Sequence, residues 1–297
     1  MLVKAMSKVY IAGEYAILKK DAYAILAPVK KYTYVEVEKS DRLIVNSSVE
    51  DKDDLLKYAR EQAFGYVGKT CTLKYTYKTD LYSGGMKLGL GSSASVVVVT
   101  IKAILEYFKV PYTKDDLFLL SVRALKKAGS NGSMGDVACI CFEDLIRYKR
   151  IDEDENYEIK AIKPRGNLKI NLLHAGISAS TTKQVQKVEK YFNTKEYIDF
   201  TNLSNKYTLD LEEAITTGDS LRVKEDIYKL RNNLKYLEQF TNLTIHSKVL
   251  EELIGDKKER KTSGAGLGDF VIEVRLDYDE KRSTYEVCFG MWVFRLS

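Results

Sequence analysis

The sequence of 297 residues contains little histidine. Its two histidines, His174 and His246, give little basis for a histidine-ligated metal or a Ser-His triad. The four cysteines form no C-x-x-C pair, and Cys139 and Cys141 stand in the apolar run VACICF. We therefore interpret the cysteines as buried free thiols in a reducing compartment.

Long apolar runs and an extended basic stretch are also missing. Apolar runs such as VVVV at residues 96–99 are far shorter than the ~20 residues of a membrane-spanning helix. Residues 1–12 lack the apolar core and cleavage site of a secretory signal. The net charge is only +5, with basic residues scattered among acidic ones, whereas a nucleic-acid binder usually shows a basic patch. We expect a cytoplasmic protein with neither a membrane nor a nucleic acid as partner.

Strand and helix patterns alternate along the chain, without repeats or a proline-rich linker. Residues 71–78 alternate as in a strand with one wet face, and residues 53–64 have helical spacing. A capping box at Thr113 and Asp116 begins another helix, which Gly129 ends. The second half contains, in order, the strand NLLHAGIS, helices over 183–192, about 200–216 and 220–239, and the strands VIEVRLDY and YEVCFGMWVFRL. The pattern predicts an α+β fold of two lobes, with domains at residues 1–168 and 169–297.

The stretch KLGLGSSAS places glycines and serines at the start of a long apolar helix. Gly89 and Gly91 lack a Cβ and allow the backbone to curl closely around a ligand. Ser92 and Ser93 lie where the first N–H groups of the helix have no internal partner, so an anion is favoured there. Their hydroxyls can donate to a phosphate or bind Mg²⁺, and Lys87 can add positive charge.

Three interpretations of this stretch compete. A Walker loop is excluded because no lysine precedes Ser92. GLGSSA matches the dinucleotide pattern G-x-G-x-x-A, but YSGGMK separates the glycines from a strand, contrary to that motif. Phosphate binding and a merely structural helix start both stay open on this stretch alone.

Two more small-residue loops favour phosphate binding. NGSMGD, residues 131–136, precedes an apolar helix with Asp136 in its first turn, where a carboxylate could also simply cap the helix. KTSGAGLGD, residues 261–269, is a third glycine cluster. Together with Lys8 beside the first strand, these loops form a set that can wrap a polyanion.

The motifs SKVYIAGEYAIL, KLGLGSSAS and KTSGAGLGD, in this order, resemble those of the GHMP kinase superfamily. Within it, the chain is most similar to the phosphomevalonate kinase family, through IAGEYAIL, GLGSSASVVVVTIKAIL and NGSMGDVACICFEDLIRY. The resemblance implies an N-terminal lobe with the nucleotide loop and a ferredoxin-like C-terminal lobe. It also implies transfer of the γ-phosphoryl group of Mg-ATP to 5-phosphomevalonate.

The resemblance further implies roles for individual residues. Lys8 and Asp136 match the catalytic positions. Nucleotide binding is implied for Lys87, Gly89, Leu90, Gly91, Ser92, Ser93 and Ala94, with Ser93 also binding Mg²⁺. Acceptor binding is implied for Glu14, Tyr15, Asn131, Gly132, Ser133, Thr181, Thr182, Ser263, Gly264, Ala265 and Gly266.

The acceptor chemistry limits the role of Asp136. A phosphate monoester loses its second proton with a pKa of about 6, so the nucleophile needs no base at neutral pH. We hypothesise that Asp136 orients Lys8 or the metal, while the charge of Lys8 stabilises the transition state.

The chain departs from the family pattern at three positions: Ser7 and Leu267 stand where glycine is common, and Phe270 where cysteine is common. Because leucine does not readily adopt a positive φ, we expect the loop to differ locally at Leu267, or not to need glycine there. Other acceptors, such as mevalonate, homoserine or a sugar, remain alternatives. So does a catalytically silent metabolite-binding protein.

Overall fold

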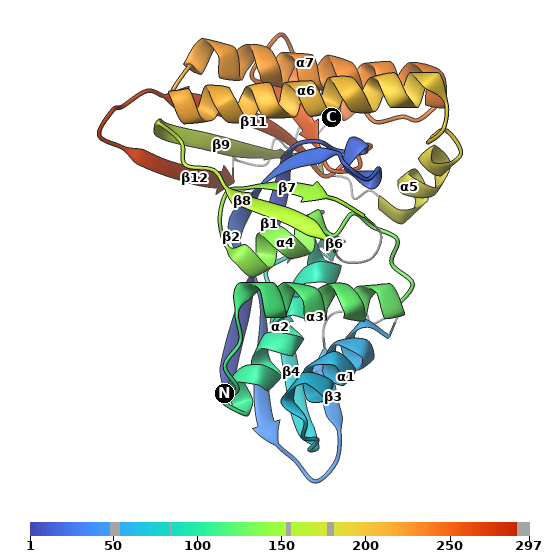
Figure 1. Cartoon of the computed structure of the whole chain (residues 1–297), viewed down its shortest axis with the longest axis vertical. Coiled ribbons are helices and arrows are strands. Elements are labelled where there is room, and N and C mark those ends of the chain that lie inside the picture. Colours follow the sequence, from blue (N-terminus) through green and yellow to red (C-terminus); the bar gives the residue numbers. More distant parts are fainter. Residues whose placement is uncertain (48–53, 84, 153–155, 177–180, 290–297) are drawn as a thin grey trace. The chain divides into compact units, whose positions relative to one another are not determined.

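The computed structural model describes residues 1–47, 54–83, 85–152, 156–176 and 181–289, and it has the predicted mixed α+β fold (Figure 1). The chain forms two compact units. Unit 1 comprises Met1–Lys8 and Pro28–Glu143, and unit 2 comprises Val9–Ala27 and Asp144–Ser297. The predicted domain boundary between residues 168 and 169 stays a prediction. In the described residues, no helix is both long and apolar enough to cross a membrane.

Unit 1 consists of a sheet with helices packed on it. Its strands come from β1 (Leu2–Ala12), β2 (Tyr23–Lys39), β3 (Ile44–Ser47) and β4 (Leu73–Thr79). Strand β4 pairs antiparallel with β2 and parallel with β3, and β1 pairs with β2. The helices are α1 (Leu55–Val67), α2 (Ser92–Tyr107), α3 (Lys114–Lys127) and α4 (Gly135–Phe142). A small hairpin, β5 (Tyr82–Ser83) with β6 (Met86–Lys87), precedes α2.

Local sequence signals account for these elements. Leu73, Tyr75 and Tyr77 of β4 are buried, as the alternating pattern predicts, and the Tyr77 hydroxyl lies 2.9 Å from the Thr100 hydroxyl of α2. The capping box of α3 is confirmed, because the Thr113 hydroxyl accepts from the Asp116 amide and the Asp116 carboxylate accepts from the Thr113 amide. Among the free cysteines, Cys139 and Cys141 are buried as expected. The expectation is wrong for Cys71 and Cys288, which are exposed.

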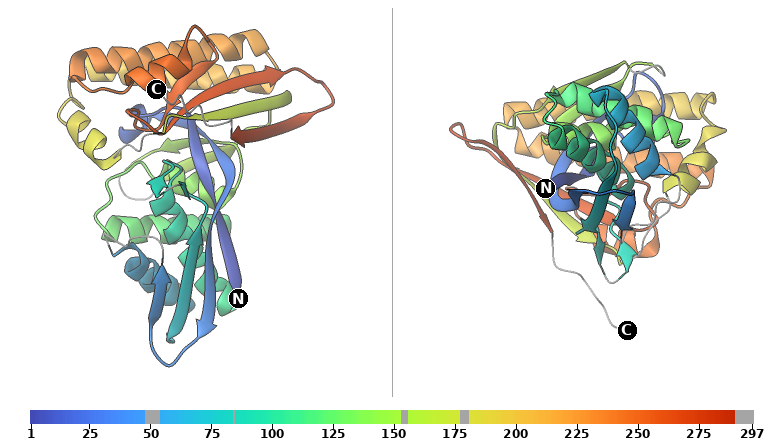
Figure 2. Two further views of the ribbon diagram at one scale, coloured as in Figure 1. Left: turned by 180° about the vertical axis from the view of Figure 1, so that it is seen from behind. Right: turned by 90° about the horizontal axis from the view of Figure 1, so that it is seen from below.

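Unit 2 contains a second sheet and a pair of long helices. The sheet has the order β10 (Arg260–Ser263), β11 (Phe270–Asp277), β9 (Gly166–His174), β12 (Ser283–Phe289). Its helices are α5 (Thr181–Glu189), α6 (Lys195–Thr217), α7 (Ser220–Thr241) and α8 (Lys248–Ile254). Helices α6 and α7 pack side by side, and α7 covers β10 and β11 (Figures 1 and 2). The first part of β2 pairs with β7 (Ile146–Arg150), which pairs with β8 (Tyr157–Ala161).

The second sheet follows the ferredoxin-like pattern over β9, β10 and β11, with helices between β9 and β10. The helix expected between the third and fourth strands is absent from the described chain, since only residues 278–282 join β11 to β12. Strand β12 therefore runs parallel to β9. This connection crosses β9 at Gly166, where φ is 122° and a Cβ would lie 2.3 Å from the Asp277 carbonyl oxygen. Only glycine fits that crossing.

Candidate functional site

The GLGSS loop of unit 1 ends in an uncapped helix start. Gly91 precedes α2 with a φ of 83°, and no side chain caps the helix. The first helical bond runs from the Ser95 amide to the Gly91 carbonyl, at 2.9 Å. Within the described residues, the amides of Ser92, Ser93 and Ala94 donate to no acceptor. These donors and the dipole of a 16-residue helix favour an anion at this point.

Lys8 lies directly against this loop. Its amide donates to the Leu90 carbonyl at 3.2 Å, and its side chain crosses Gly91 so closely that a Cβ there would lie 2.8 Å from the Lys8 Cε. Lys8 is only 7% exposed. The predicted proximity of the N-terminal lysine and the nucleotide loop is therefore present in unit 1. Of the two serines, Ser92 is buried and Ser93 is exposed.

The NGSMGD loop forms the start of α4 in the same unit. Met134 precedes the helix with a φ of 65°, and the Ser133 hydroxyl accepts from the Gly135 amide at 3.4 Å. Asp136 is half-buried in the first turn and accepts from the Val137 amide at 3.0 Å. Asn131 is exposed. The proposed action of Asp136 on Lys8 or a metal stays a prediction.

The SGAGLGD loop of unit 2 follows β10. Gly264 and Gly266 have φ values of 75° and 72°, and Leu267 has a φ of 62°. Leu267 thus adopts the left-handed conformation that we expected leucine to avoid, and the loop keeps a backbone for which glycine is usual. The Leu267 amide donates to the Ile245 carbonyl at 2.8 Å, which holds the residue in this conformation.

The side chains of Glu14 and Tyr15, predicted to bind the acceptor, contact the segment around this loop. The Glu14 carboxylate accepts from the Lys261 ammonium at 2.5 Å, and the Tyr15 hydroxyl donates to the Ala265 carbonyl at 2.5 Å. The Ser263 hydroxyl donates to the Tyr10 carbonyl at 2.7 Å. Burial lowers the pKa of Lys261, which the neighbouring Glu14 carboxylate opposes. Burial also raises the pKa of Tyr15.

Thr181 and Thr182 are predicted to bind the acceptor, and Ser93 is predicted to bind Mg²⁺. Helix α5 begins at Thr181, but the side chains of Thr181 and Thr182 lie outside the described residues. No cluster of three or more His, Cys, Asp or Glu side chains able to hold a metal occurs in the described chain. Unit 1 offers the exposed Ser93 hydroxyl and the Asp136 carboxylate. Such a sparse set fits Mg²⁺ that arrives bound to phosphates, because Mg²⁺ commonly uses one or two protein ligands besides substrate oxygens.

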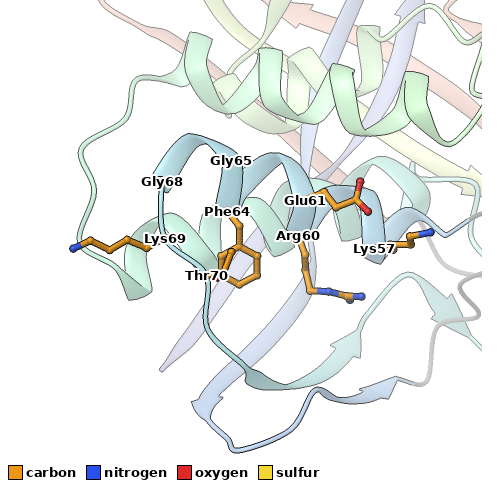
Figure 3. A pocket seen from close by; sticks show the side chains of 8 residues that line it. All are labelled: Lys57, Arg60, Glu61, Phe64, Gly65, Gly68, Lys69 and Thr70. Carbon is orange, nitrogen blue, oxygen red and sulfur yellow. The ribbon is translucent and has the colours of Figure 1, made fainter.

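A hollow of about 550 Å³ lies elsewhere, along the exposed side of α1 (Figure 3). It is lined by Lys57, Arg60, Glu61, Phe64, Gly65, Gly68, Lys69 and Thr70. None of the predicted site residues lines it, so it does not form part of the candidate site.

Comparison with known proteins bears directly on these loops. Residues 51–144 match the family described as GHMP kinases N terminal domain. Over these residues, the chain is similar to the N-terminal domain of GHMP kinases. The matched segment includes both the GLGSS and the NGSMGD loops, whereas Lys8 and the SGAGLGD loop lie outside it.

Similarity to GHMP kinases also extends over the whole chain. The phosphomevalonate kinase of Streptomyces sp. (strain CL190) is 24% identical over 95% of this chain and 91% of its own. The structure of Streptococcus pneumoniae phosphomevalonate kinase in complex with phosphomevalonate and AMPPNP superposes with a TM-score of 0.85. It is 26% identical, covering 95% of this chain and 94% of that one. Methanococcus jannaschii mevalonate kinase shares the fold, with a TM-score of 0.72 and 20% identity over 95% and 91% of the two chains. The predicted resemblance is confirmed, and these similarities support a kinase.

The sequence did not single out Lys261 or Tyr10 as site residues. Lys261 stands inside the quoted motif KTSGAGLGD, two positions before Ser263, so its side chain lies on the same face of β10. That spacing was the available signal. The partner, Glu14, is 247 positions away along the chain, and no local pattern reveals such a pairing.

Proposed function

We propose that the protein is a phosphomevalonate kinase, which transfers the γ-phosphoryl group of ATP to (R)-5-phosphomevalonate to give 5-diphosphomevalonate and ADP. The observation that carries the proposal is the packing of the Lys8 side chain on Gly91, beside the unpartnered amides that begin α2. It places a fixed positive charge next to a helix start suited to a triphosphate. Similarity to phosphomevalonate kinases over nearly the full chain supports this choice of acceptor.

Charge is the main problem in this reaction, since both reactants are anions. The amides of Ser92, Ser93 and Ala94 would bind phosphate oxygens of ATP through preorganised donors. Lys8 would neutralise charge on the transferring group, an interaction that strengthens as the transition state forms. Mg²⁺ bound to ATP, with Ser93 and Asp136 as the candidate protein ligands, would supply further neutralisation of the phosphates.

Proton removal contributes little in this proposal. The acceptor phosphate is mostly deprotonated at neutral pH, so a general base is not required. Asp136 then serves to orient Lys8 or the metal. In unit 2, Ser263 is already hydrogen-bonded through its hydroxyl to Tyr10, and the backbone amides of residues 264–266 would bind the anionic substrate instead.

The test is an ADP-release assay with Mg-ATP and a panel of acceptors: 5-phosphomevalonate, mevalonate, homoserine and galactose. We expect turnover with 5-phosphomevalonate to exceed that with each other acceptor by at least 100-fold in kcat/KM. A preference for mevalonate or homoserine would replace the proposed acceptor with that compound. Tight binding of an ATP analogue, with no ADP formed from ATP in the presence of any acceptor, would instead indicate a metabolite-binding protein.

A further inference from the structure

Strand β10 and the loop after it are attached at alternate residues to the end of β1 and to the segment that follows it. The Lys261 ammonium donates to the Glu14 carboxylate at 2.5 Å and to the Thr262 carbonyl at 2.7 Å. Lys261 is fully buried, and the Glu14 side chain is 3% exposed. Two positions later, the Ser263 hydroxyl donates to the Tyr10 carbonyl. Because side chains alternate along a strand, Lys261 and Ser263 lie on the same face of β10.

A third attachment acts on the loop itself. The Tyr15 hydroxyl donates to the Ala265 carbonyl at 2.5 Å, and Tyr15 is 5% exposed. On either side of Ala265, two glycines hold positive φ values of 75° and 72°. Among the residues that the structure describes, the amides of Gly264, Ala265 and Gly266 donate to no group. Consecutive free amides in such a turn form a concavity suited to an anion.

The segment that carries Glu14 and Tyr15 is itself held firmly. Gly13 packs so closely on β2 that a Cβ would lie 2.2 Å from the Tyr23 carbonyl oxygen. From α6, the Tyr197 hydroxyl donates to the Tyr15 carbonyl at 2.8 Å. Lys19 donates to the Phe192 carbonyl at 3.0 Å. The segment is therefore a rigid support for the loop, rather than a mobile connection.

The Lys261–Glu14 pair is costly for the fold. Removing two charges from water requires several kcal/mol per ion, and apolar residues of similar volume often stabilise a protein as well or better. The burial of Lys261 also keeps it from touching a substrate. Lys261 lies two residues before Ser263 and four before Ala265, so it acts through the conformation of the loop.

We propose that Lys261 is a positioning residue which, through Glu14 and together with Tyr15, fixes the backbone amides of residues 264–266 for binding of the anionic acceptor. This inference rests on the proposed function. It assigns Glu14 and Tyr15 an indirect action on the acceptor, through the loop that they hold.

A double-mutant cycle tests the pair. We expect Lys261→Met and Glu14→Gln each to raise the KM for 5-phosphomevalonate by about tenfold or more, because small displacements of binding groups are costly. The double variant should be no worse than the worse single variant, since one interaction is lost in all three. Partial unfolding would lower kcat through the amount of active enzyme and leave KM unchanged.

Tyr15→Phe removes one hydroxyl and no charge, and it keeps the test informative if the charge variants do not fold. We expect the same rise in KM from it. The matched control is Tyr191→Phe, which removes a phenol that is bonded to the Thr241 carbonyl at 3.4 Å and not to the 264–266 loop. The control should retain the wild-type KM.

Two results would overturn the proposal: a KM within twofold of wild type in Tyr15→Phe, or fully additive effects of Lys261→Met and Glu14→Gln. Additivity would mean that the two residues act independently, as expected if Glu14 contacts the acceptor directly. Failure of the proposed function is a separate result, because wild-type protein would then release no ADP with 5-phosphomevalonate.

Discussion

The contact between Lys8 and Gly91 leads to a quantitative prediction for Gly91→Ala. The residue has a φ of 83°, and an alanine in the left-handed region costs about 1–2 kcal/mol of stability. The new Cβ would also lie 2.8 Å from the Lys8 Cε and 3.4 Å from the Lys8 Cγ. A flexible side chain can yield, so the overlap adds little to the loss of stability. This movement of the Lys8 side chain must, however, displace its ammonium group.

The expected effect on catalysis is therefore larger than the effect on stability. A displacement of about 1 Å at a transition-state contact can cost about 100-fold in rate. We expect Gly91→Ala to lower kcat/KM for ADP release by about that factor, while urea denaturation shows a loss of no more than about 2 kcal/mol. Both quantities can be measured on the same preparation.

Gly129 provides a matched control within unit 1. Its φ is 79°, close to that of Gly91. Among the described residues, however, a Cβ added at Gly129 would have no heavy atom within 4 Å apart from those of its chain neighbours. Gly129→Ala should therefore suffer the same backbone strain and keep wild-type activity. Equal losses of kcat/KM in the two variants would refute the reasoning, because backbone strain alone would then explain both.

Two other predictions concern single charges. Lys8→Met should lower kcat by at least about 1,000-fold with an unchanged melting temperature, since it removes a charge aimed at the transition state; a kcat within tenfold of wild type would contradict the assignment of Lys8. Burial alone would raise the pKa of Glu238, but bonds from the His246 ring and from the Ile245 and His246 amides hold it below its ordinary value. This carboxylate therefore stabilises the fold above the ordinary carboxyl pKa and loses that contribution as the pH falls through its lowered pKa. Glu238→Gln should flatten the acid side of the curve of unfolding free energy against pH. An unchanged curve would contradict this role of Glu238.

Features that depend on neighbouring residues were predictable from the sequence. The capping box at Thr113, the start of α2 at the GLGSS serines and the alternation in β4 each use signals within a few positions. Helix α6 begins earlier than its apolar pattern predicts, at Lys195, because the Thr194 side chain caps it by accepting from the Tyr197 amide. Such signals determine where elements begin and end, and less securely how they pair.

Features that depend on distant pairing were not predictable in this way. The parallel run of β12 beside β9 follows from a five-residue connection that crosses at Gly166, and the bond between Lys261 and Glu14 joins opposite ends of the sequence. Neither partner carries a local mark of the other. Family resemblance identified the loops as site candidates, but not the buried contacts that hold them.

Leu267 illustrates how such contacts override a local preference. A leucine with a φ of 62° is strained by itself, and the loop sequence alone argues against it. Its amide, however, donates to the Ile245 carbonyl, and Gly266 packs against the same residue so closely that a Cβ would lie 2.5 Å from the Ile245 Cγ2. Glu238 in turn binds the amides of Ile245 and His246. The surrounding bonds thus determine the backbone at Leu267 more strongly than the side chain does, which is the condition under which strained residues persist in folded proteins.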